Sequence, residues 1–156
     1  MKKVLKAVAL MIFAGFLFLA VIYLAKPLYF NWGASQGERV VALPGDTFVA
    51  NPSSTHTVAI TIRAMPEKIY PWILQIGAEQ GGWYSFTSIE KLIQCEIKNA
   101  DSLHPEWQNR KVGDEVKFCP GESGPPAYTV VALDPGRSMV LAHQAKDGSY
   151  VDTWEF

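Results

Sequence analysis

The longest apolar run of the chain lies near its N-terminus, where no charged residue occurs between residues 7 and 25. A helix rises 1.5 Å per residue, so this run spans about 28 Å, close to the ~30 Å hydrocarbon core of a bilayer. Lys26 and Pro27 end the run. Tyr29 and Trp32 then stand where interfacial aromatic residues anchor a helix. The pattern predicts a transmembrane helix at 7–25, with the lipid bilayer as its partner.

The lysines around this run predict its orientation. Lys2, Lys3 and Lys6 precede the run, and a single lysine follows it closely. Positively charged flanks stay in the cytoplasm, so residues 1–6 are expected there as a basic N-terminus, with everything after the helix outside. A cleaved signal peptide is the alternative. Because the apolar region of a signal peptide usually has only about 7–15 residues, the length of this run favours the anchor.

The next residues give two further patterns. Residues 26–55 lack a helical period and are rich in glycine, proline, serine and asparagine towards their end, which predicts a linker. Residues 56–63 alternate between apolar and polar side chains, which is typical of a half-buried strand. The apolar side of that strand is expected to carry Val58, Ile60 and Ile62.

Two helices are predicted after this strand. Pro66 suits the first position of a helix, and Pro71 inside it predicts an irregular first turn. The apolar stripe of this helix follows the helical spacing at Ile69, Trp72, Ile73 and Ile76. A second helix is predicted at 85–94, where Thr87 and Glu90 fit a capping box. Its buried stripe is expected to comprise Phe86, Ile89, Leu92 and Ile93.

The rest of the chain predicts an antiparallel meander. Apolar strand segments recur at 112–118, 127–133, 138–145 and 150–156. Asp134-Pro-Gly-Arg137 and the Asp-Gly pair at 147–148 are turn signals between them. Because the helices are grouped after one strand and before several others, residues 56–156 are predicted to form an α+β domain with a curved antiparallel sheet.

The charge, the motifs and the cysteines of the chain limit which partners and cofactors are expected. The net charge is −1, and without a basic excess no nucleic-acid partner is expected. The sequence has no metal-ligand spacing and no nucleotide-binding loop, so no metal and no cofactor are predicted. Cys95 and Cys119 are the two cysteines. Two buried thiols are the favoured interpretation, and a disulfide is the alternative for an exported domain.

Candidates for catalysis are restricted to one loop. Asp101 and Glu106 flank His104 beside Trp107, and a carboxylic acid near a histidine is suited to general acid–base chemistry. The competing interpretation is that the polar residues of this loop satisfy backbone groups.

Aromatic residues are the more informative candidates. Aromatic walls with few polar groups suit an apolar small molecule, and Tyr and Trp keep one polar atom each. The predicted ligand-binding residues are Trp83, Tyr84, Phe86, Trp107, Tyr128 and Trp154. Ordinary core packing is the competing explanation for each of them.

Four segments together resemble bacterial membrane-anchored members of the SRPBCC superfamily, the START-like or helix-grip domains that include polyketide-cyclase-like proteins. They are PEKIYPWILQIGAEQGGWYSF, CEIKNADSLHPEWQNRKVGDEVKF, PPAYTVVALDPGRSMVLA and TWEF, and WGAS and LPGD resemble the approach segment of such proteins. The resemblance implies a long curved sheet around a C-terminal helix, with an apolar cavity between them. That helix is missing here, so the domain is expected to be incomplete.

These observations predict a membrane-anchored domain that binds a hydrophobic small molecule or lipid without catalysis. One alternative is an interaction or sensing module at the membrane. Another is a cyclase- or hydrolase-type enzyme that uses the loop at 99–108.

Overall fold

We describe residues 2–121 and 124–156 from a computed structural model, in which the chain forms two compact units. The first unit comprises the residues up to 41 together with Ser54–Ile62. The second comprises Ala42–Ser53 and Arg63–Phe156. Part of the predicted linker therefore belongs to the second unit.

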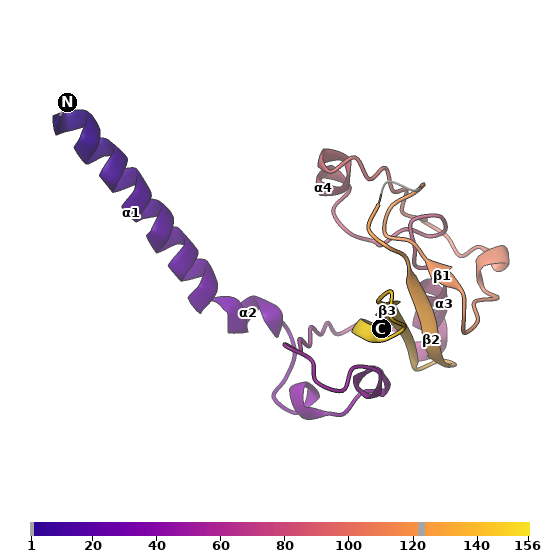
Figure 1. Cartoon of the computed structure of the whole chain (residues 1–156). Coiled ribbons are helices and arrows are strands. Elements are labelled where there is room, and N and C mark those ends of the chain that lie inside the picture. Colours follow the sequence, from indigo (N-terminus) through magenta and orange to yellow (C-terminus); the bar gives the residue numbers. More distant parts are fainter. Residues whose placement is uncertain (1, 122–123) are drawn as a thin grey trace. The chain divides into compact units, whose positions relative to one another are not determined.

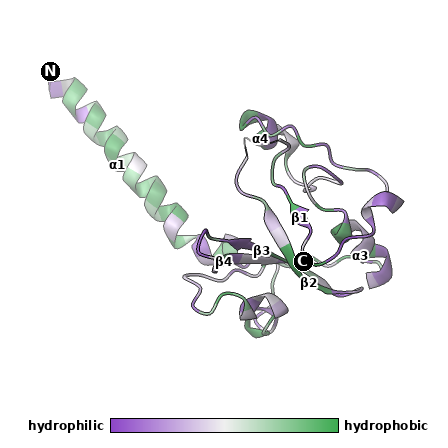
Figure 2. Cartoon of the chain, turned by 45° about the vertical axis from the view of Figure 1, so that its right-hand side comes forward, coloured by the Kyte–Doolittle hydropathy of each residue, from purple (hydrophilic) through white to green (hydrophobic). Residues whose placement is uncertain are grey.

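Helix α1, Lys2–Leu24, is the main element of the first unit (Figure 1). Its segment Val4–Leu24 has a mean hydropathy of 2.7, and none of its most apolar stretch is buried against protein. Figure 2 shows apolar residues along most of the helix. An unburied helix of this length and composition is long and apolar enough to cross a membrane. A short helix, α2, Lys26–Phe30, and a 3₁₀ turn, η1, Glu38–Val40, follow it.

The prediction of a strand at 56–63 is wrong. The segment belongs to no strand, and its apolar side chains at 58, 60 and 62 are exposed. Its Ala59 N–H donates to the carbonyl oxygen of Trp32 at 3.0 Å. Gly33 makes this approach possible, because a Cβ at its φ of +76° would collide with the carbonyl oxygen of Ala59. Alternation produces a strand only where a neighbouring strand supplies a ladder, and the second unit builds its sheet without this segment.

The second unit is built on a four-stranded antiparallel sheet in the order β1-β2-β3-β4. Its strands are β1, Glu115–Val116; β2, Tyr128–Asp134; β3, Ser138–Gln144; and β4, Tyr150–Glu155. The predicted meander and the α+β class are confirmed. The first strand is shorter than expected, because only two of its residues pair with β2. A helix gripped by the sheet, as the resemblance implies, is not among the described residues.

The two faces of the sheet are covered by different elements. Helix α3, Pro66–Leu74, begins at the predicted proline, continues through Pro71 without a break and contacts β3 on one face. On the other face the 3₁₀ turn η2, Pro44–Thr47, contacts β3 and β4. There the Gly45 N–H donates to the Glu155 carboxylate at 2.8 Å.

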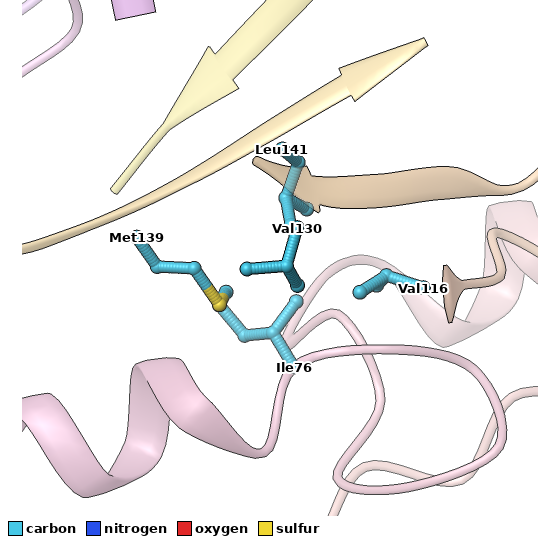
Figure 3. Close-up of a cluster of buried hydrophobic side chains, with 5 residues drawn as sticks. All are labelled: Ile76, Val116, Val130, Met139 and Leu141. Atoms are coloured by element: carbon cyan, nitrogen blue, oxygen red, sulfur yellow. The ribbon is translucent and has the colours of Figure 1, made fainter. Parts of the chain in front are cut away.

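The main core lies between the first face and the end of α3 (Figure 3). The buried members of this cluster are Ile76, Val116, Val130, Met139 and Leu141. Val130, Met139 and Leu141 are fully buried. Of the predicted apolar stripe, Ile73 packs against this cluster and Ile76, just beyond the end of α3, belongs to it. Trp72 instead contacts Tyr84. Each fully buried side chain of this size contributes about 1.5–3 kcal/mol relative to exposure.

Helix α4, Thr87–Leu92, differs from its prediction in two ways. Its apolar stripe is exposed, and Glu90 is the buried residue of the helix. The predicted capping box is also absent: Phe86 occupies the N-cap position, and the Ser85 hydroxyl donates to Glu90. The helix is also shorter than the predicted 85–94, with Phe86 and Ile93 at its two caps. The predicted burial of the stripe is wrong, because burial depends on a neighbouring apolar surface and α4 turns Glu90 to the protein instead.

A disulfide joins Cys95 to Cys119, so the interpretation as two thiols is wrong. Their Cα atoms are 5.2 Å apart, and Cys95 lies in a second buried cluster with Ala78 and Ile97. The bond ties the segment after α4 to the segment after β1.

Replacing both Cys95 and Cys119 with serine is expected to lower the free energy of unfolding by about 3 kcal/mol, because the crosslink closes a loop of 24 residues in the unfolded chain. Urea unfolding of the full chain in detergent, followed by tryptophan fluorescence, measures this. The oxidised wild type is the reference, and the reduced wild type should unfold like the variant. Equal midpoints for all three would contradict a structural disulfide.

Candidate functional site

The pairing of the strands determines which side chains lie on the same face of the sheet. Val130 pairs with Leu141, which in turn pairs with Trp154 on β4. Directly opposed residues lie on the same face, so all three belong to the face that α3 partly covers. Trp154 remains 44% exposed because α3 does not cover its end of the sheet.

Beside the core, this face carries five aromatic side chains, which we call the aromatic cluster: Trp83, Phe118, Tyr128, Trp154 and Phe156. Phe118 lies at its centre. Its ring stacks on Trp83 with centroids 4.5 Å apart and an interplanar angle of 9°. It meets Tyr128 edge-on at 5.0 Å and Trp154 edge-on at 5.3 Å. Such offset and edge-to-face geometry is favourable for aromatic quadrupoles.

A pocket of about 260 Å³ opens next to this cluster. It is lined by Phe118, Pro125, Pro126, Tyr128 and His143. The volume is just below the roughly 300–1,000 Å³ of small-molecule sites, so it fits one ring or a short chain rather than a whole lipid. Phenyl and proline rings make most of the wall apolar, and the tyrosine and histidine supply the polar atoms.

A polar group borders the pocket. The Tyr128 hydroxyl donates to the Asp152 carboxylate at 2.5 Å, and His143 is the cross-strand partner of Asp152. Burial, followed by the hydrogen bond to Asp152, raises the pKa of Tyr128 above its usual range. The phenol therefore stays neutral at physiological pH, and its oxygen can accept a hydrogen bond from a bound molecule.

Of the six predicted ligand-binding residues, Tyr128 lines the pocket, and Trp83 and Trp154 belong to the aromatic cluster beside it. The other three lie elsewhere. Tyr84 contacts Trp72 edge-on at 5.9 Å, and Phe86 is exposed at the start of α4. Trp107 stacks on His104 with ring centroids 4.0 Å apart, in the 3₁₀ turn η3, Pro105–Trp107.

The candidate catalytic residues form no enclosed site. His104 and Glu106 contact each other at 3.2 Å at the surface, and Asp101 is exposed and accepts from Ser102. The pKa of Glu106 is lowered mainly by its own backbone N–H and then by His104. This contribution to folding is present above the usual glutamate pKa and is lost as the pH falls through the lowered value.

A buried glutamine explains the shape of this loop. The Gln75 side chain, fully buried after α3, donates to the Tyr84 hydroxyl at 2.7 Å and to the Ser102 carbonyl oxygen at 3.1 Å. Its oxygen accepts from the His104 N–H at 3.2 Å and from the Gln108 amide at 3.3 Å. Two polar residues of the loop also satisfy backbone groups, as the competing interpretation has it: Asn99 accepts from the Tyr84 N–H at 2.8 Å, and Gln108 donates to the Pro71 carbonyl oxygen at 3.2 Å.

Several residues of the site escaped the sequence reasoning, namely Phe118, Pro125, Pro126, His143 and Asp152. One signal for Phe118 was available, because it lies two positions after the buried Val116 and shares its parity. The prolines gave no such signal, since their place beside the sheet depends on how the connection between β1 and β2 folds back.

Comparison with models of protein families, with curated protein sequences and with solved structures found no match to this chain. The case for a function therefore rests on the geometry of the site.

Replacing Gln75 with methionine is expected to lower the free energy of unfolding by about 2–3 kcal/mol, because it keeps the volume but removes four hydrogen bonds that a fully buried side chain makes to this loop and to Tyr84. Glu106→Gln is the matched control at the surface of the same loop and should change stability by no more than about 0.5 kcal/mol. Urea unfolding of both variants tests this. Equal stabilities would show that the loop does not depend on the glutamine.

Proposed function

We propose that this protein is a membrane-anchored binder of a hydrophobic small molecule or lipid segment. The observation that carries the proposal is the pocket between Phe118, Tyr128 and His143, with the aromatic cluster beside it. Its size fits a single ring or the end of an acyl or isoprenoid-like chain. The Tyr128 hydroxyl orients a polar end of the ligand at the rim.

The anchor supports a ligand drawn from the membrane. Helix α1 holds the binding domain at the bilayer, which raises the effective concentration of a lipid-dissolved ligand at the pocket. The lysines before the helix favour an N-terminus in the cytoplasm and a domain outside it. The disulfide supports the same placement, because such bonds persist in oxidising compartments.

The site favours binding without catalysis. Asp101, His104 and Glu106 lie on the surface of the loop rather than in the pocket. Tyr128 and His143 supply the polar groups of the pocket wall. Asp152 accepts from the Tyr128 hydroxyl and is the cross-strand partner of His143. Because the pKa of Tyr128 is raised, its hydroxyl stays protonated and suits an orienting role rather than that of an activated nucleophile.

Tyr128→Ala is expected to reduce ligand capture about tenfold, because it removes one wall of the pocket and about 1.4 kcal/mol or more of apolar contact. The probe is a fatty acid carrying a diazirine, photoactivated in vesicles that contain the full chain. Crosslinked peptides are then identified by mass spectrometry. Trp107→Ala is the control, since this indole lies on the loop and away from the pocket. Equal labelling of the wild type and Tyr128→Ala would refute the site.

The orientation is tested by single cysteines. A thiol introduced by Ser149→Cys in the turn between β3 and β4 should react with a membrane-impermeant maleimide in intact cells. One introduced by Lys2→Cys should react only after the cells are permeabilised. The native cysteines are paired and do not compete. The reverse pattern would place the domain in the cytoplasm.

A further inference from the structure

Helix α4 has the opposite polarity to an ordinary surface helix. Its apolar stripe faces solvent, with Phe86 at 75%, Ile89 at 56%, Leu92 at 83% and Ile93 at 66% exposure. The acid of the helix, Glu90, is 7% exposed. In water, four large apolar side chains favour burial and a carboxylate favours exposure. This orientation therefore favours an apolar environment, rather than water, on the outer side of the helix.

The inward side of α4 is fixed by specific bonds. The Ser85 hydroxyl donates to the buried Glu90 carboxylate, and the Glu90 carbonyl oxygen accepts from the Cys95 N–H at 2.8 Å. Cys95 is 3% exposed and is held by the disulfide to Cys119. The C-terminal end of the helix is thus joined to the second buried cluster through Cys95. With Glu90 on the inner side of the helix, the apolar stripe lies on its outer side.

The composition of this surface indicates a lipid bilayer as its occupant. Because Glu90 points inward, the solvent side of α4 carries Lys91 and no acid; Lys98 is exposed nearby, with Glu96 as the one exposed acid of that stretch. Phenylalanine and aliphatic residues beside lysines are typical of interfacial helices, whose cations meet anionic headgroups. Interfaces with proteins are instead depleted in lysine. Helix α1 of the same chain is long and apolar enough to cross a membrane, so a bilayer is the apolar environment that the anchor proposed above brings to this chain.

We propose that Phe86, Ile89, Leu92 and Ile93 insert into the bilayer that α1 crosses, and so fix how the domain stands on the membrane. This inference rests on the anchor of the proposed function and is independent of the ligand pocket. A stripe of four side chains is too small for strong membrane binding alone. A tether converts its docking into an intramolecular step, for which a small apolar surface is sufficient.

The test places an environment-sensitive dye on the stripe. Leu92→Cys gives the full chain a single free thiol, which is labelled with a nitrobenzoxadiazole dye. The protein is reconstituted in vesicles of phosphatidylcholine and phosphatidylglycerol, with or without doxyl-labelled lipid. We expect a blue-shifted emission and about twofold or greater quenching by the doxyl lipid. The same dye on Ser149→Cys, in the exposed turn after β3, is the control and should not be quenched.

A second substitution separates insertion from mere proximity. Adding Phe86→Ser and Ile89→Ser to the labelled Leu92→Cys chain should reduce the quenching at least about twofold, while the disulfide and the circular dichroism stay unchanged. Flotation with the vesicles and no quenching at position 92 would overturn the inference while leaving the anchor intact. Failure to float would overturn the anchor and the inference together. Energy transfer between labelled copies without lipid quenching would identify a second copy as the occupant and also overturn it.

Discussion

The fold of the second unit depends on burying one face of β2 and β3 under the end of α3. Val130, Met139 and Leu141 are fully buried there and pack with Ile76. A sheet of four strands needs such a cover, because an isolated hairpin or a bare sheet is marginal in water. Since α3 has only nine residues, it covers only part of the face. The uncovered part is where the aromatic cluster and the pocket lie.

The end of α3 holds the loops that complete the site. Arg110 donates to the carbonyl oxygens of Leu74 at 3.0 Å and Ile76 at 2.6 Å, and it also contacts Gln80. Burial lowers the pKa of this guanidinium, but an arginine remains a cation and suits the negative end of a helix. Arg110 and Gln75 together fix the segment of the chain that leads to Trp83. The Trp83 indole in turn donates to the Lys117 carbonyl oxygen at 3.3 Å. A polar scaffold thus positions an apolar site.

Two apolar surfaces of the second unit remain open to solvent, and they differ in form. The face that carries the aromatic cluster contains the pocket, and the Tyr128–Asp152 hydrogen bond lies beside it. This arrangement suits a bound molecule with one polar end. The α4 stripe is a convex helix face with lysines nearby, which suits a lipid surface. Both surfaces are consistent with the membrane-anchored binder proposed above, whose helix α1 is long and apolar enough to cross a membrane.

The sequence by itself determined the elements whose signals are local. An uninterrupted apolar run predicted α1, and Asp-Pro-Gly and Asp-Gly turns between apolar segments predicted the hairpins of β2, β3 and β4. The helical spacing also located α3 and the stripe of α4. Tertiary structure decided what each pattern faces. The alternating segment at 56–63 has no partner strand in the sheet. The α4 stripe lies outward because Glu90 and Cys95 face the protein. The contacts of Phe118 with Trp83 and Trp154 join residues that are far apart in the sequence. Periodicity states that a side of an element is apolar, but which surface covers it depends on contacts between residues far apart in the chain.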